Sequence, residues 1–232
     1  ENAEIYSNLL NKDISAEYFK KFFKRNTGLY KKVFKSIKAL RSTNTQLWTI
    51  VVMTIFSNYK YFKKIPNNPS NSVFEYEKFF EVLEKFIFSY SIVTKSPSNK
   101  VQTHFAQFSE QLRTWARENT NFDDVQRELQ TSFYDKINAK IPNRDEFKKL
   151  VKQNIKYTSK NIPLCHYYLH EIENKVFGNI ITSEATIEHI IPRTPKKWRL
   201  KAKEVPGLHH IGNLILLEMR LNSGGAGNKV FN

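Results

Sequence analysis

The last fifth of the chain holds four residues whose types and spacing suit phosphodiester hydrolysis: Glu188, His189, Asn213 and Asn222. Such a reaction needs a base that deprotonates water and a group that neutralises the developing charge. Histidine is the natural base, because its unperturbed pKa lies near 6.5. Carboxylate and amide oxygens suit a hard cation such as Mg²⁺, which keeps several waters. His189 is therefore the candidate base, and Glu188 and Asn222 are candidate metal ligands.

Two apolar runs and a following helix must position these four residues. Residues 185–191 form a β-rich run, and Pro192 after it keeps the backbone extended. Residues 213–217 form a second such run, and a helix should follow from about Glu218 or Leu221. The order strand, long loop, strand, helix predicts a small ββα module.

The adjacency of the acid and the histidine makes a geometric demand. Neighbouring side chains of a regular strand point to opposite faces, so the first strand must end or twist at Glu188 and His189 for both to serve one site. His189 taken alone would be read as a half-buried strand histidine. Together with Glu188, Pro192, Asn213 and Asn222 in this order, a catalytic role is favoured.

Three short motifs carry a family resemblance. The residues E-H-I-I-P at 188–192, G-N-L at 212–214 and L-N-S at 221–223 resemble the HNH (ββα-metal) endonucleases. The residues of these three motifs are most similar to those of the nuclease domain of GmrSD-type modification-dependent restriction enzymes. The resemblance covers residues 164–231 at least.

The resemblance implies a role for each motif residue. In HNH enzymes the metal is bound by the acid before the histidine and by the last asparagine. These residues correspond to Glu188 and Asn222 in this sequence. The histidine is the general base, here His189, and the middle asparagine, Asn213, braces the loop between the strands. Relatives often carry a lysine past the last asparagine, and Lys229 could fill that place and contact phosphate.

The family also implies a substrate, a cofactor and a partner. The expected activity is nicking or cutting of DNA with Mg²⁺, or with Mn²⁺, in defence against phage or other foreign DNA. Relatives carry an N-terminal domain related to ParB-like nucleotide hydrolases, whose D-G-Q-Q-R signature is absent here. We therefore expect this NTPase or sensor domain to lie outside this chain, which begins with Glu1 and is interpreted as a fragment of a longer protein.

Basic residues in the connection between the two strands are candidate contacts for the DNA backbone, although solvated loop charge is the alternative. They are Arg193, Lys196, Lys197, Arg199, Lys201 and Lys203. His209 and His210 directly precede the second strand. They could support the site by bonding a phosphate or bracing the loop, or they could be ordinary polar loop residues.

The net charge of +15 favours a polyanionic partner. The region between Glu17 and Glu75 contains no acid but many lysines and arginines, which uniform genomic bias would not produce. A nucleic-acid surface is favoured, and anionic lipid is the weaker alternative. No apolar run approaches the roughly 20 residues that a membrane span needs. The single cysteine, Cys165, excludes an internal disulfide and suits a bacterial cytoplasm.

The hydrophobic pattern of residues 1–160 predicts consecutive amphipathic helices, so the predicted fold class is mainly α. Residues 43–59 are expected to form one apolar core helix. The predicted organisation is a helical DNA-clamping body over residues 1–160 and an HNH-type ββα-metal nuclease module over residues 161–232.

Two other readings stay open beside the nuclease. One is a nucleic-acid-binding module with an inactive site, and the other is a nuclease that acts on RNA. His166 and His170 lie four residues apart and could bind Zn²⁺, but a third ligand at a suitable spacing is missing from the sequence, so packing is favoured.

Overall fold

The chain divides into two compact units, Glu1–Asn143 and Arg144–Asn232, hereafter unit 1 and unit 2. The computed structural model describes residues 2–11, 16–23, 27–63, 74–178, 185–194 and 205–219. The boundary expected from the sequence, between residues 160 and 161, lies inside unit 2. The segment before that point belongs to unit 2 because the backbone N–H of Tyr157 donates to the carbonyl of His209, at 2.7 Å.

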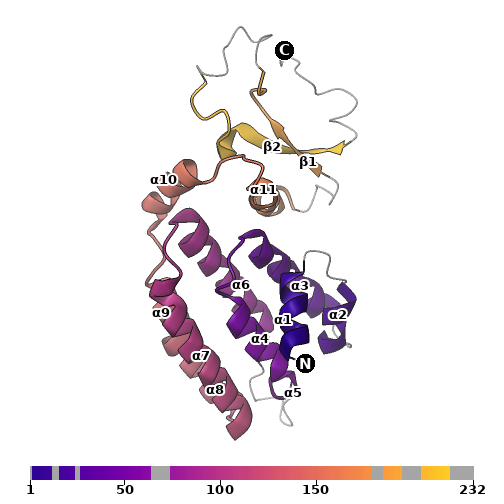
Figure 1. The fold of residues 1–232 in the computed structure, drawn as a ribbon, viewed down its shortest axis with the longest axis vertical. Helices are drawn as coiled ribbons and strands as arrows, with labels where there is room; N and C mark the ends of the chain where they lie inside the picture. The colour runs from indigo at the N-terminus through magenta and orange to yellow at the C-terminus, as the bar shows by residue number, and fades with distance from the viewer. Residues whose placement is uncertain are drawn as a thin grey trace. The chain divides into compact units, whose positions relative to one another are not determined.

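All the regular elements in the described part of unit 1 are helical (Figure 1). Its α-helices are α1 Asn2–Leu10, α2 Ala16–Lys20, α3 Thr27–Ser42, α4 Thr49–Ser57, α5 Tyr59–Phe62, α6 Tyr76–Ile87, α7 Asn99–Glu118, α8 Phe122–Leu129 and α9 Asp135–Asn138. A 3₁₀ turn at Lys21–Phe23 and two π-helical segments, Phe88–Val93 and Gln130–Tyr134, continue neighbouring helices. Helix α4 packs against α1 and α7, and α3 packs against α6.

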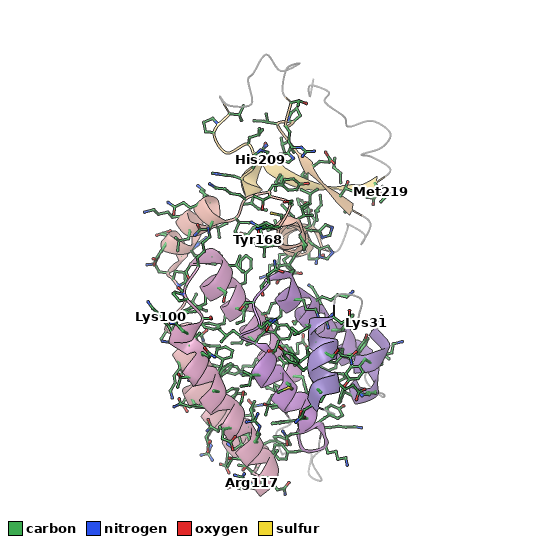
Figure 2. All side chains as sticks on the ribbon, in the orientation of Figure 1. Lys31, Lys100, Arg117, Tyr168, His209 and Met219 are labelled. Atoms are coloured by element: carbon green, nitrogen blue, oxygen red, sulfur yellow. The ribbon has the colours of Figure 1, made fainter. Side chains whose placement is uncertain are left out.

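Aromatic side chains fill the core of unit 1. The rings of Phe108 and Phe133 stack with their centroids 4.0 Å apart, and Phe79 stacks on both. Such rings contribute large buried apolar areas and specific packing geometry. Charged side chains such as Lys31 and Lys100 are exposed on this unit (Figure 2).

The prediction of one helix over residues 43–59 is wrong. Helix α3 ends at Ser42, a turn follows in which Asn44 has a φ of 55°, and α4 begins at Thr49. The Thr43 hydroxyl donates to the carbonyl of Leu40. Short polar side chains compete in this way with the backbone hydrogen bonds of a helix. The expected helix therefore begins at Thr49, six residues later than predicted.

Unit 2 combines two helices with a small sheet (Figure 1). Its elements are α10 Arg144–Asn154, α11 Ile162–Phe177, β1 Ala185–His189, a 3₁₀ turn Ile211–Asn213 and β2 Leu214–Glu218. The strands pair antiparallel, and α11 packs against both of them. Gly178 caps the C-terminal end of α11, and its φ of 73° is a conformation that glycine adopts readily.

The mainly helical class with a two-stranded sheet is confirmed. The helix expected after the second strand, from Glu218 or Leu221, falls almost entirely outside the described residues. Among the described helices, none combines the length and apolar character that crossing a bilayer requires.

Candidate functional site

The strand pair places Glu188 and His189 at the end of β1. His189 pairs with Leu214, and Glu188 pairs with Ile215. Paired residues share a face, whereas neighbours along a strand alternate. His189 therefore lies on the face of the buried Leu214, and Glu188 on the face of Ile215, which is 37% exposed. A site that uses both side chains can form only where β1 ends.

Asn213 ties together the two loops that flank the strand pair. Its Oδ1 accepts the backbone N–H of Ile191 at 2.9 Å, and its Nδ2 donates to the carbonyls of Ile191 at 3.0 Å and Leu208 at 2.8 Å. Its own carbonyl accepts the N–H of Ile190 at 2.9 Å. These bonds fix the backbone directly after His189 and leave the imidazole outside the network.

Two rings contact the imidazole of His189. Its Nε2 lies 3.2 Å from Nδ1 of His209, and the two rings are perpendicular with centroids 5.3 Å apart. The ring of Tyr157 meets His189 edge to face, with centroids 4.9 Å apart. Together with the main-chain bond between Tyr157 and His209, these contacts hold the three side chains as one cluster.

Tyr157 was not anticipated from the sequence. It lies between α10 and α11, where Lys156 forms an isolated antiparallel bridge with His210. The one local signal is that Ile155 is buried, Lys156 exposed and Tyr157 half-buried, an alternation typical of a short extended segment.

The surroundings of His189 favour its neutral form. Burial lowers the pKa of His189 below its usual value, and the nearby His209 and Arg193 lower it further. Burial penalises the charged imidazolium, and the positive charge of Arg193 repels it. A histidine in this state can accept a proton, which is what a general base must do.

His210 differs from His209 in its surroundings. Its ring packs over Gly207, where an added Cβ would lie 3.2 Å from Nδ1 of His210 and where φ is +78°. The N–H of His210 also donates to the carbonyl of Gly207 at 2.8 Å. His210 thus closes the turn before β2, while its neighbour contacts His189.

Part of the predicted site lies outside the described residues. Arg193 is described and exposed, and Glu188 is half-buried. Residues 195–204 and 220–232 are not described, and they include Lys196, Lys197, Arg199, Lys201, Lys203, Asn222 and Lys229. Within the described ranges, His, Cys, Asp and Glu side chains form no group of three that could hold a metal ion.

The histidine pair on α11 has structural partners. His166 Nε2 bonds the carbonyl of Ala185 at 3.0 Å, which ties α11 to the start of β1. His170 Nδ1 bonds the amide of Asn174 at 2.8 Å. Burial raises the pKa of the neighbouring Cys165 thiol to about 11, so this thiol is protonated near neutral pH.

Comparison with known families adds an independent observation. Residues 141–232 match the family model described as GmrSD restriction endonucleases, C-terminal domain. The match begins three residues before unit 2, which starts at Arg144. Comparisons with curated proteins and with solved structures gave no significant match. Residues 141–232 are therefore similar to the C-terminal domain of the GmrSD restriction endonucleases.

Proposed function

We propose that unit 2 is a metal-dependent endonuclease that nicks or cuts DNA in defence against phage or foreign DNA, with His189 as its general base. The family match supports a nuclease. The observation that carries the proposal is the placement of His189 at the end of β1, where its ring contacts Tyr157 and His209 and the loop after it is held by Asn213.

The contact between the two histidines suggests which nitrogen acts. In one tautomer, Nε2 of His189 carries the hydrogen and forms a hydrogen bond to Nδ1 of His209. Nδ1 of His189 then keeps a lone pair. That lone pair can accept a proton from the attacking water, and the resulting imidazolium still donates to His209. His209 then orients the base, as a hydrogen-bond acceptor orients the histidine of other hydrolytic sites.

The donor types that the motif supplies suit a hard divalent cation. Glu188 offers carboxylate oxygens, and Asn222 would add an amide oxygen, with water completing the shell as Mg²⁺ prefers. When bound, such an ion neutralises charge that develops on the scissile phosphate. We propose Mg²⁺, with Mn²⁺ as a substitute. Because Glu188 and His189 occupy opposite faces, the phosphate would have to lie beyond the end of β1.

Basic residues supply the attraction for a polyanion. Arg193 lies near enough to His189 to lower its pKa, and it would also attract a phosphate that approaches the base. The lysines that follow Arg193 in the sequence, from Lys196 to Lys203, would add further contacts to the DNA backbone. Contacts to phosphates give affinity without sequence readout. We further propose that the lysine-rich helices of unit 1 bind duplex DNA in the same way.

Supercoiled plasmid nicking tests this proposal. The chain is incubated with Mg²⁺, with Mn²⁺ and with EDTA, and a matched duplex RNA is tested in parallel. Metal-dependent nicking of DNA supports the proposal. Cleavage of RNA alone would favour an RNA-directed nuclease, and DNA binding without cleavage by the complete protein would favour a binding module with an inactive site.

A further inference from the structure

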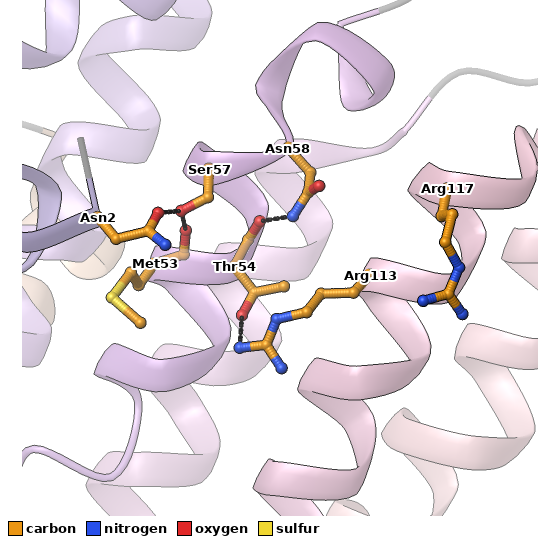
Figure 3. A pocket seen from close by; sticks show the side chains of 7 residues that line it. All are labelled: Asn2, Met53, Thr54, Ser57, Asn58, Arg113 and Arg117. Carbon is orange, nitrogen blue, oxygen red and sulfur yellow. Dashed lines mark hydrogen bonds between the residues drawn. The ribbon is translucent and has the colours of Figure 1, made fainter.

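Unit 1 contains a polar cavity that the nuclease proposal does not use. The cavity has a volume of about 390 Å³ and lies among α1, α4 and α7 (Figure 3). A pocket of this size can hold a small ligand. The polar side chains that line it are Asn2, Thr54, Ser57, Asn58, Arg113 and Arg117.

Hydrogen bonds hold one wall of the cavity in place. The Ser57 hydroxyl donates to Oδ1 of Asn2 at 2.6 Å, which joins α4 to the start of α1. The Asn58 amide donates to the carbonyl of Thr54 at 2.9 Å. In Figure 3 Asn2 and Ser57 lie at the left and Arg117 at the right, with Thr54 and Asn58 between them. A wall that is already ordered loses little conformational entropy when a ligand binds.

The opposite wall carries two guanidinium groups. Arg113 and Arg117 are four residues apart on α7, so they lie on one face of the helix. Arg113 pairs with Glu110 at 2.9 Å and donates to the Thr54 hydroxyl at 3.4 Å. Arg117 donates to the Thr114 hydroxyl at 3.2 Å and, within the part of the chain that the structure describes, has no carboxylate within ion-pair distance.

The helix ends nearby offer a simpler reason for the arginines. Helices α4 and α7 both end at this cavity, and the C-terminal end of a helix carries partial negative charge that a cation offsets. However, Arg113 and Arg117 donate to threonine hydroxyls, whereas the carbonyl of Thr54 is bonded by Asn58. Most of the five N–H donors of Arg117 remain available to a ligand.

We propose that this cavity binds a phosphate group. The planar guanidinium matches phosphate oxygens through paired hydrogen bonds, and the hydroxyl and amide groups opposite can complete the shell. The net charge of +15 draws anions to the chain in general, and the cavity gives one anion a defined place. The phosphate belongs either to a small phosphorylated molecule or to a nucleic-acid backbone.

Isothermal titration calorimetry of the whole chain with inorganic pyrophosphate tests the site. Arg117→Gln is the principal variant, because its exposed side chain has no ion pair to lose among the described residues. Lys100→Gln is the matched control, since Lys100 is exposed on the same helix but does not line the cavity. We expect saturable binding by the wild type. The affinity should fall about tenfold or more in Arg117→Gln, as for a lost charge-assisted hydrogen bond, and should stay unchanged in Lys100→Gln.

Three results would overturn the proposal. They are no saturable binding by the wild type, equal binding by Arg117→Gln, or an equal loss in Lys100→Gln. A role limited to helix ends predicts that Arg117→Gln lowers thermal stability and leaves pyrophosphate binding unchanged. Cleavage is not measured, so the outcome is independent of the nuclease proposal.

A competition experiment identifies the source of the phosphate. If the cavity holds a backbone phosphate, pyrophosphate displaces a short DNA duplex, and Arg117→Gln reduces the salt dependence of duplex binding by about one unit of slope. If the ligand is a small phosphorylated molecule, pyrophosphate binds without displacing the duplex. Both results support a phosphate site.

Discussion

His189 and His209 contact each other through Nε2 and Nδ1, 3.2 Å apart, although twenty residues separate them in the sequence. The loop that carries His209 is bonded to Tyr157 on one side and to Asn213 on the other. The candidate base is therefore oriented by residues from three separate segments of unit 2, each of which can be tested by substitution.

Replacing His209 by alanine should slow plasmid nicking without abolishing DNA binding. The base loses the partner that fixes its ring, and orienting partners of histidines at metal sites are worth roughly tenfold to a hundredfold in activity. The rate under single-turnover conditions measures this effect. His210→Ala is the matched control, since His210 packs over Gly207. Equal losses in both variants would mean that the contact with His189 has no special role.

Substitutions at Asn213 should separate its acceptor from its donors. Asn213→Asp keeps the acceptor for the N–H of Ile191 but loses both donated bonds. Asn213→Leu loses all three, at a cost of roughly 1 to 3 kcal/mol to the stability of unit 2. Hydrogen exchange at the amide of Ile191 should therefore stay slow in Asn213→Asp and become fast in Asn213→Leu. Fast exchange in the wild type would contradict the brace.

Tyr157 should act through its ring, not its hydroxyl. Tyr157→Phe keeps the ring against His189 and should retain the wild-type nicking rate. Tyr157→Ala removes the contact and should lower kcat, while KM for DNA stays constant because no phosphate contact is lost. The main-chain bond to His209 remains in both variants. A higher KM at unchanged kcat would instead place Tyr157 in substrate binding.

The stability of unit 1 should fall in mild acid because of His104. Burial lowers the pKa of this imidazole, followed by repulsion from Lys136 and Lys140, and its ring stacks on Phe133. Since the folded pKa lies below the unfolded value, the unfolded chain binds more protons as the pH falls. Neutral His104 therefore makes its full contribution to the stability of unit 1 above about pH 6.5, and this contribution is lost progressively as the pH falls further.

Urea unfolding at about pH 5 and about pH 7.5 measures this loss, since those values bracket the titration of histidine. His104→Gln should reduce the difference in stability between the two conditions. An unchanged difference in this variant would assign the acid sensitivity to other groups.

Local patterns predicted most of the helices and both strands. The apolar runs at 185–191 and 213–217 correspond to β1 and β2 with shifts of one or two residues at their ends. The prediction failed at residues 43–48, which were assigned to the start of a helix but form the turn before α4, where the Thr43 hydroxyl bonds the carbonyl of Leu40. Hydrophobic periodicity records burial and carries little information about such competing local bonds.

The surroundings of His189 could be predicted only in part. Motif order named His189, Glu188 and Asn213 as candidate site residues, because their neighbours in sequence carry the signal. The contact with Tyr157 depends on how the connection between α10 and α11 pairs with a loop some fifty residues later. Such long-range pairing is a property of the fold, and the sequence around Tyr157 gives only a weak strand pattern.

The central claim is that His189 is the base of a metal-dependent DNA nuclease. The most direct test compares supercoiled plasmid nicking with Mg²⁺ by the wild type, His189→Ala and His170→Ala, a histidine of α11 bonded to Asn174. The account predicts that His189→Ala loses roughly a hundredfold or more of the rate, as for a missing general base, and that His170→Ala keeps it. Metal-dependent nicking that survives in His189→Ala would contradict the account and place the active site elsewhere.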